Sequence, residues 1–204
     1  MFTEEQVKNE TMLFSATPDF AEENGGPITK HVVSLLKEKG ISPNTIIDSR
    51  VHMLMPGWIP AIGGWHLDGV PRDKDGQPIM DHPQLKIMNH WIYIVDFGTG
   101  ATTEYVPSRG LTNTLPPEKG NSSTLWKRHS LLINDYIDDH YLKPLKVNSN
   151  ELTNIQANTY HRGVKATGTG WRFFLRASEN TLSTPRNEIR RQVQAYIESE
   201  NEGW

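Results

Sequence analysis

Two residues of metal-binding type stand two positions apart in the segment PGWIPAIGGWHLDGVPR, namely His66 and Asp68. The segment is apolar and strand-like up to this point, and a long polar loop follows it. On a strand the side chains at positions i and i+2 face the same way, so an imidazole and a carboxylate converge on one point. This pair supplies half of a metal site. The alternative is a loop-entry pair in which the carboxylate orients the imidazole or caps a turn.

A third ligand has to come from a distant strand, and His161 is the best candidate because it ends one strand-like run and precedes a second one, GWRFFLRAS. Two histidines and one carboxylate on one face of an octahedral ion suit non-haem Fe(II), since three positions remain open for substrate and oxygen. The sequence therefore predicts that His66, Asp68 and His161 form a catalytic metal site. The remaining histidines do not share ligand spacing and are expected on the surface or in the core. They are His31, His52, His82, His90, His129 and His140.

The run GWRFFLRAS carries two cations within a core-like strand. With a period of two, Arg172, Phe174 and Arg176 share one face. An inward-facing arginine in a barrel needs an anion, and guanidinium pairs naturally with a carboxylate. A small dicarboxylate whose other end chelates the metal would satisfy both groups. The alternative is that the two arginines flank an exposed strand edge.

The order His66-x-Asp68, then His161, then an arginine eleven residues on, resembles the Fe(II)/2-oxoglutarate-dependent oxygenases. The stretch PGWIPAIGGWHLDG is similar to the phytanoyl-CoA-type and prolyl-hydroxylase-type branches, and the resemblance covers Ile47 to Ser178. It implies a double-stranded β-helix, or jelly roll, that holds iron through the three ligands. It also implies that 2-oxoglutarate chelates the iron and places its 5-carboxylate on Arg172, with Arg176 as the alternative anchor. The implied reaction uses O2 to hydroxylate a substrate and releases succinate and CO2.

The arrangement of expected elements predicts a mainly β chain with flanking helices, in one domain over residues 1–204. The first part, 1–40, is helical, and GPITKHVVSLLKEKG places apolar residues on one helical stripe. A cupin-like jelly-roll core follows over 41–178, with short β-branched and aromatic runs and one helix in WKRHSLLINDYIDDHYL. The core strand IMNHWIYIV offers the pocket either Asn89, Trp91 and Tyr93 or, on its other face, His90. A C-terminal helix is expected over 184–200, with Thr184 as N-cap and Pro185 at its first position.

The composition narrows the class of protein further. The chain of 204 residues contains no cysteine, so any metal must sit on histidine or carboxylate ligands, and its net charge of −3 gives no overall positive field for a nucleic acid. No apolar run is long enough for a membrane helix, and the acidic start is unlike a secretory signal, so a cytoplasmic location is expected. The expected partner is a small-molecule or peptidyl substrate, selected by the loops GVPRDKDGQPIMDHP and SRGLTNTLPPEKGNSST.

Two rival functions remain open. A cupin-like metalloenzyme would use the same ligands without 2-oxoglutarate, which leaves Arg172 without a required task. A non-enzymatic jelly-roll binding or structural protein would use His66 and Asp68 only to hold a loop. Metal content separates the second rival from both enzymes.

Overall fold

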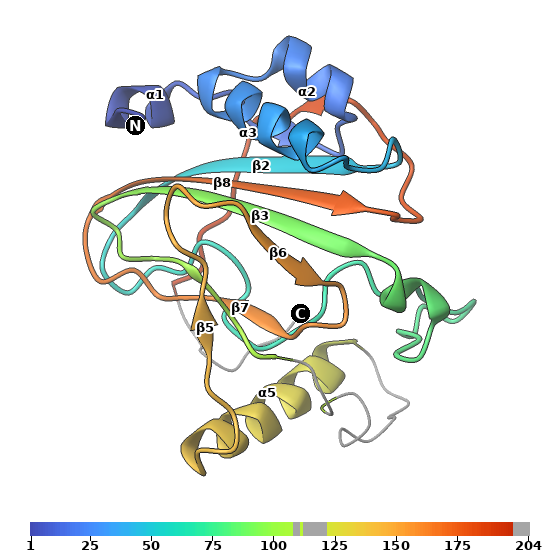
Figure 1. Ribbon diagram of the computed structural model, residues 1–204. Coiled ribbons are helices and arrows are strands. Elements are labelled where there is room, and N and C mark those ends of the chain that lie inside the picture. Colours follow the sequence, from blue (N-terminus) through green and yellow to red (C-terminus); the bar gives the residue numbers. More distant parts are fainter. Residues whose placement is uncertain (108–110, 112–121, 198–204) are drawn as a thin grey trace.

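Two main antiparallel sheets, a third sheet of only two strands and four α-helices make up the computed structural model, which describes residues 1–107, 111 and 122–197 (Figure 1). The helices are α1 (Glu4–Lys8), α2 (Pro18–Asn24), α3 (Pro27–Glu38) and α5 (Ser122–Asp138), with a 3-10 helix η1 (Pro83–Lys86). The strands are β1 (Leu13–Phe14), β2 (Ile46–Leu54), β3 (Asn89–Phe97), β4 (Thr103–Tyr105), β5 (Leu145–Lys146), β6 (Thr153–Gln156), β7 (His161–Gly163), β8 (Gly170–Glu179) and β9 (Glu188–Ile189). The prediction of a mainly β chain with a few helices is confirmed.

The larger sheet has the order β2-β8-β3-β6, and every neighbouring pair is antiparallel. Strand β8 lies inside it and pairs with the whole of β2, from Ile46 opposite Ser178 to Leu54 opposite Gly170. Because β8 carries Arg172 and Arg176, these arginines do not lie on a sheet edge. The interpretation of the two arginines as flanking an exposed edge is therefore wrong.

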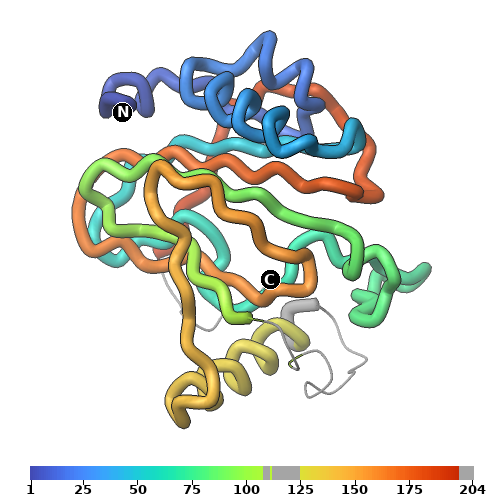
Figure 2. The backbone as a smooth tube through the Cα atoms, viewed as in Figure 1, coloured from blue at the N-terminus to red at the C-terminus, as the bar shows by residue number. Residues whose placement is uncertain are grey.

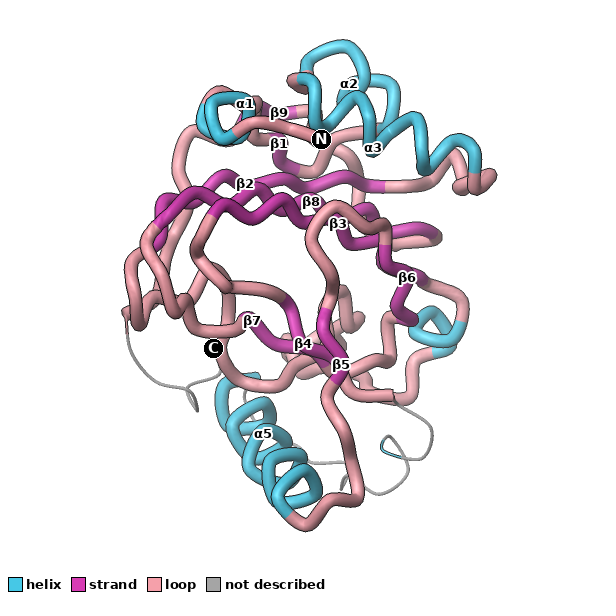
Figure 3. The backbone as a smooth tube through the Cα atoms, turned by 60° about the vertical axis from the view of Figure 1, so that its left-hand side comes forward, coloured by secondary structure: helices cyan, strands magenta, loops and turns pink. Residues whose placement is uncertain are grey.

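The smaller sheet has the order β5-β4-β7, and a backbone bridge between His66 and His161 adds the segment around His66 beside β7. Figure 3 shows the two sheets as separate layers, with α1, α2 and α3 outside the larger sheet and α5 outside the smaller one. Segments far apart in sequence thus meet at the smaller sheet, which sets the position of both histidines.

The two faces of the larger sheet differ in chemistry because side chains alternate along each strand. On β2 and β8 the apolar face carries Ile47, Val51, Phe173 and Leu175, which are at most 8% exposed and pack against the helical layer. Burying an aliphatic or aromatic side chain of this size contributes about 1.5–3 kcal/mol. The opposite face looks toward the smaller sheet and carries the charged residues, so the helical layer stabilises the sheet without occupying the face that carries the site.

Helix α3 anchors this layer. Pro27 occupies its first turn, and Ile28, Val32 and Leu36 recur at a spacing of four as a fully buried stripe. Its N-cap, Gly26, offers no side chain, and the Glu10 carboxylate instead accepts hydrogen bonds from the backbone N–H groups of Ile28 (2.9 Å) and Thr29 (3.4 Å). An acidic group at this end also complements the helix dipole.

The prediction of a C-terminal helix over 184–200 is wrong for the described residues 184–197, which contain only the short strand β9 and an isolated bridge at Tyr196. Residues 198–200 lie outside the described residues. We call residues 186–197 the C-terminal strap. It pairs with the N-terminal segment through β9 and β1, and then exchanges two backbone hydrogen bonds of 2.8 Å between Tyr196 and Ile59 (Figure 2). A short isolated helix is marginal in water, and here partners in two other segments satisfy the backbone instead.

The other expected elements agree with the structure in part. The helix expected in WKRHSLLINDYIDDHYL is confirmed as α5, and the expected strands in IMNHWIYIV, in GWRFFLRAS and in LTNIQANTYH, the run that ends at His161, correspond to β3, β8 and β6. A turn splits LTNIQANTYH, so that β6 ends at Gln156 and His161 starts β7. Most of the loop SRGLTNTLPPEKGNSST lies outside the described residues. Within the described ranges, the helices are too short or too polar to span a membrane.

Candidate metal centre

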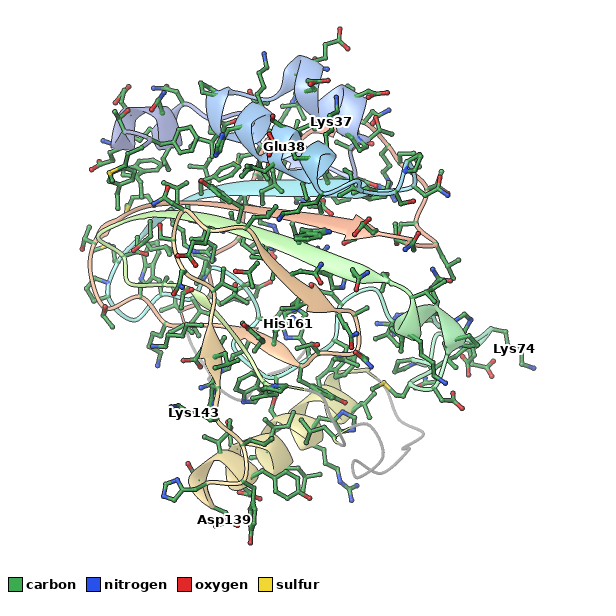
Figure 4. All side chains as sticks on the ribbon, in the orientation of Figure 1. Lys37, Glu38, Lys74, Asp139, Lys143 and His161 are labelled. Carbon is green, nitrogen blue, oxygen red and sulfur yellow. The ribbon has the colours of Figure 1, made fainter. Side chains whose placement is uncertain are left out.

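His66 and His161 face each other across the smaller sheet. Their backbones exchange two hydrogen bonds of 3.1 Å, which makes them a directly opposed pair, and their ring centroids are 4.7 Å apart. Both residues are buried, and Figure 4 shows His161 in the interior between the two sheets. Asp68 follows His66 by two positions and turns its carboxylate toward both rings. The three groups offer ligand atoms that all lie within 4.8 Å of one another, so they could hold a metal ion.

Each imidazole is oriented by a carbonyl of its own segment. His66 Nδ1 lies 2.7 Å from the Gly64 carbonyl oxygen, and His161 Nδ1 lies 3.0 Å from that of Thr159. A carbonyl only accepts, so each Nδ1 donates its proton and each Nε2 is directed at Asp68. The distances from Nε2 to the carboxylate are 3.8 Å for His66 and 3.2 Å for His161.

In the neutral form of both rings, two Nε2 lone pairs and a carboxylate meet in one place. Lone-pair donors that face one another repel unless a cation, either a metal ion or a proton, lies between them. Burial lowers the pKa of His66 to about 4, with the neighbouring His161 adding to this effect, so His66 is neutral at pH 7. Neutral imidazole and ionised carboxylate are the forms that bind metals, and the donor set therefore fits a divalent transition metal.

Asp68 remains ionised because of Arg176. Burial opposes the charge on Asp68, but the Arg176 guanidinium holds the pKa of this carboxyl well below its usual range. Arg176 Nη1 contacts Asp68 Oδ2, while its Nη2 lies 3.5 Å from Asp48 Oδ2. Arg176 is thus bound to two carboxylates, one of them a predicted metal ligand.

Arg172 precedes Arg176 by four residues on the same face of β8 and is 2% exposed. Its Nε donates to the Ala101 carbonyl oxygen at 2.9 Å, and its guanidinium lies over the Phe174 ring at 5.2 Å. Among the described residues it forms no ion pair within 4.0 Å. Burial lowers its pKa to about 10, so it keeps its charge at pH 7. The two arginines named from the sequence therefore have different partners.

A cavity of about 540 Å³ connects the triad with this charged face. Its walls come from the larger sheet, the smaller sheet, the segment 60–62 and the C-terminal strap. Its polar lining includes His66, Asp68, His161, Asp48, Arg50, His52, Arg172, Arg176, Arg190 and Gln194. The sequence-predicted residues thus lie around one space.

Sequence reasoning missed Asp48, Arg50 and His52 on β2. They alternate with Ile47, Ser49 and Val51, so the run IIDSRVH already places three ionisable groups on one face. They lie opposite the arginines: Asp48 pairs with Arg176 in register, and His52 with Arg172. That period-two pattern was the signal that could have found them. Arg190 of the strap, whose Nη2 lies 3.3 Å from Asp48 Oδ1, had no such signal because that segment is helix-like in sequence.

The inward face of β3 is now defined. Ile92 lines the cavity, whereas Tyr93 packs in the core under the helices. His90 shares the face of Ile92, and its ring centroid lies 6.4 Å from that of His161. Its Nδ1 is 2.9 Å from Ser178 Oγ, and burial lowers its pKa to about 3. Of the two faces left open by the sequence, the one with His90 faces the site.

Arg162, next to His161, has a structural partner. Its Nε and Nη2 both lie 3.0 Å from Glu104 Oε2, directly across β4 and β7, and its guanidinium lies 4.5 Å from the Trp65 ring centroid. This charged group therefore pairs within the smaller sheet.

Comparisons with known proteins give little. No family model matches the chain, and no curated protein matches it. One solved structure that does match is described as a non-heme monooxygenase, ThoJ–Ni complex, with 9% sequence identity and a TM-score of 0.38. That match covers 86% of this chain and 76% of that chain. The likeness is too distant for anything about function to be taken from it.

Proposed function

We propose that the chain is an Fe(II)- and 2-oxoglutarate-dependent oxygenase, in particular a hydroxylase, with His66, Asp68 and His161 as the iron ligands. The single observation that carries the proposal is the convergence of two oriented imidazoles and one ionised carboxylate at the wall of a cavity. Two histidines and a carboxylate suit Fe(II) and leave positions for a co-substrate and O2.

The strand pairing supports a jelly roll, the double-stranded β-helix of this proposal. A jelly roll arises when a long hairpin of eight strands rolls up, so that strands 1 and 8, 2 and 7, 3 and 6, and 4 and 5 become partners. If the segment at His66 is counted as the second strand, the pairs β2 with β8, His66 with β7, β3 with β6 and β4 with β5 follow this order. In this arrangement the metal ligands come from the second and seventh strands.

Arg172 is our proposed anchor for the 5-carboxylate of 2-oxoglutarate. Asp96, its neighbour across β3 and β8, attracts the Arg172 guanidinium but does not form an ion pair with it within 4.0 Å. A buried guanidinium that lacks such an ion pair is costly, and a bidentate carboxylate would offset that cost. Arg176 is a weaker candidate because Asp68 and Asp48 already engage it. We assign Arg176 instead as a positioning residue that holds Asp68 ionised and directs it toward the histidines.

When bound, Fe(II) with 2-oxoglutarate and O2 supplies the oxidising power for hydroxylation and yields succinate and CO2. This chain supplies position and shielding. The carbonyls of Gly64 and Thr159 fix the two rings, and Arg176 fixes the carboxylate. The apolar Ile92 and Phe174 line the same cavity and limit the access of water. A small molecule or a peptidyl side chain is the proposed substrate.

The test is an anaerobic titration of metal-free protein with Fe(II) and then 2-oxoglutarate, followed by visible absorption. A chelated 2-oxo acid gives a weak charge-transfer band on Fe(II), and we expect this band for the unaltered protein. We expect its loss in Asp68→Ala. Circular dichroism and a thermal melt of the same variant show whether the loss reflects the site or the fold.

The two rivals correspond to different results. Fe(II) binding without the band would indicate a cupin-like metalloenzyme that does not use 2-oxoglutarate. No metal binding by a folded protein would refute both enzymes and favour a non-enzymatic binding or structural protein.

A further inference from the structure

The charged residues around the cavity are unbalanced. Arg162 lines the cavity but pairs with Glu104. Without it, four guanidinium groups face two carboxylates, those of Asp48 and Asp68. The four arginines are Arg50, Arg172, Arg176 and Arg190. The described part of the cavity therefore carries an excess of positive charge, although the whole chain has a net charge of −3.

Both carboxylates are already engaged. Asp48 lies between Arg176 (3.5 Å) and Arg190 (3.3 Å), and Asp68 contacts Arg176 and the two histidines. Arg50 has no ion pair or side-chain hydrogen bond with the described residues.

The position of Arg50 makes this lack of a partner costly. It lies opposite Phe174 in the register of β2 and β8, which puts Arg172 and Arg176 at its two diagonal neighbours on the same face. Like charges at such positions repel. Burial lowers the pKa of Arg50, and the guanidinium groups of Arg176 and Arg190 lower it further. Asp48 and Asp68 act in the opposite direction on Arg50, but both carboxylates are already engaged by Arg176 or Arg190. A half-buried cation beside three other guanidinium groups, with no ion pair of its own among the described residues, indicates a site that is completed by an anion.

The proposed co-factors do not remove the excess. A divalent iron and a doubly charged 2-oxoglutarate cancel each other, and Arg172 is the group assigned to the oxo acid. Arg50 would still face the cavity without an anionic partner. A second anion, separate from 2-oxoglutarate, would restore the balance.

We propose that the substrate carries an oxyanion group, a carboxylate, phosphate or sulfonate, and that Arg50 on β2 binds this group. The inference rests on the proposed function, because it takes the cavity as the substrate site. The C-terminal strap closes this part of the cavity with Arg190, Gln192 and Gln194, which add a cation and two carboxamides to the same wall. Arg50 thus selects an anionic substrate, and the triad acts on a C–H bond elsewhere in the same molecule.

The experiment uses the full chain with 15N-labelled arginine, loaded with Zn(II) as a diamagnetic substitute for Fe(II) so that NMR signals near the metal stay sharp. The oxo acid is titrated first, to saturation. Methylphosphonate, methanesulfonate and acetate are then titrated separately, and acetamide serves as the neutral probe. We expect at least one anion to shift the Arg50 Nε–H signal, which is assigned by its absence in Arg50→Gln, and acetamide to leave it unchanged. The anion with the tightest binding identifies the kind of headgroup.

The key variant is Arg50→Gln, and Arg186→Gln is its matched control. Arg186 lies on the strap but outside the cavity, with its guanidinium 5.3 Å from the Phe14 ring centroid. We expect Arg50→Gln to weaken binding of the anion at least tenfold, while Arg186→Gln leaves it unchanged. We also expect Arg50→Gln to melt at the same or a higher temperature, because it removes a repulsive charge; a merely structural arginine would give a lower melting temperature.

The two proposals fail in different ways. If 2-oxoglutarate binds but no anion reaches Arg50, the proposal for Arg50 is overturned and the proposed function stands. If Arg50→Gln abolishes binding of 2-oxoglutarate itself, Arg50 belongs to the oxo-acid anchor, and the proposal is again overturned. If the oxo acid does not bind at all, the proposed function fails, and the anion titration on the same sample still decides whether Arg50 is an anion site.

Discussion

Replacing Arg172 by glutamine tests whether Arg172 and Arg176, two arginines on one strand, have different functions in the cavity. Arg172 is 2% exposed, and its Nε is held by the Ala101 carbonyl oxygen at 2.9 Å. Its remaining N–H groups would bind the distal carboxylate of 2-oxoglutarate. We expect Arg172→Gln to retain Fe(II) binding and to lose most of its affinity for the oxo acid.

The magnitude follows from the hydrogen bonds that are lost. Hydrogen bonds to a charged group contribute about 1.5–3 kcal/mol each, and glutamine can replace one of two with a neutral bond. A net loss of about 2.7 kcal/mol corresponds to about a 100-fold increase in the dissociation constant. Arg172→Lys is expected to recover only part of this affinity, because an ammonium group lacks the planar fork of guanidinium.

The assay is a titration of the iron-loaded protein with 2-oxoglutarate, read by the charge-transfer band, alongside a separate measurement of Fe(II) affinity. The comparison variant is Arg176→Gln, which we expect to weaken Fe(II) binding itself because Arg176 holds Asp68 ionised. The reasoning is refuted if Arg172→Gln binds the oxo acid normally while Arg176→Gln loses it with iron affinity retained. That result would move the anchor to Arg176.

Two further predictions concern stability. Glu10→Gln should lower the free energy of unfolding by about 1–2 kcal/mol, because the Glu10 carboxylate caps the N-terminus of α3 at Ile28 and Thr29. Urea denaturation measures this change, and an unchanged free energy of unfolding would contradict the capping role. Burial and the nearby Arg172 lower the pKa of His52 to about 3, against about 6.5 in the unfolded chain, so the unfolded state binds the extra proton between these values. The free energy of unfolding should therefore fall as the pH is lowered from 7 to 4, by up to about 1.4 kcal/mol per pH unit for this histidine. Urea denaturation at a series of pH values should show a shallower fall for His52→Gln. An equal dependence on pH in the variant would exclude His52 as a contributor.

The sequence could predict those parts of the site where spacing alone determines the geometry. His66 and Asp68 are two residues apart on an extended segment, and Arg172 and Arg176 are four apart on a strand, so each pair shares a face whatever surrounds it. The pairing of His66 with His161, 95 positions further on, could not be predicted from spacing, because it depends on the tertiary structure. Only the backbone bridge between these two residues brings the rings together.

The C-terminal strap shows why local pattern was insufficient elsewhere. Ile189, Val193 and Tyr196 recur at helical spacing, but Tyr196 instead pairs with Ile59 and Arg190 pairs with Asp48. These partners lie more than a hundred residues away in the sequence. Propensity is a weak preference that tertiary contacts override, and here the strap gains sheet-like hydrogen bonds and a partner for a charge.

The larger sheet separates stability from chemistry by the alternation of its side chains. In IIDSRVH, the residues Ile47, Ser49 and Val51 face the helical layer, and Asp48, Arg50 and His52 face the cavity. The apolar face and the cap on α3 can therefore hold the strand in place while the opposite face keeps charges that repel one another. A substitution on the cavity face should change binding more than folding, and one on the helical face should do the reverse. We therefore expect Arg50→Gln to weaken anion binding without loss of stability. We expect Val51→Ala, which leaves a cavity in the core, to lower the free energy of unfolding by about 1–3 kcal/mol.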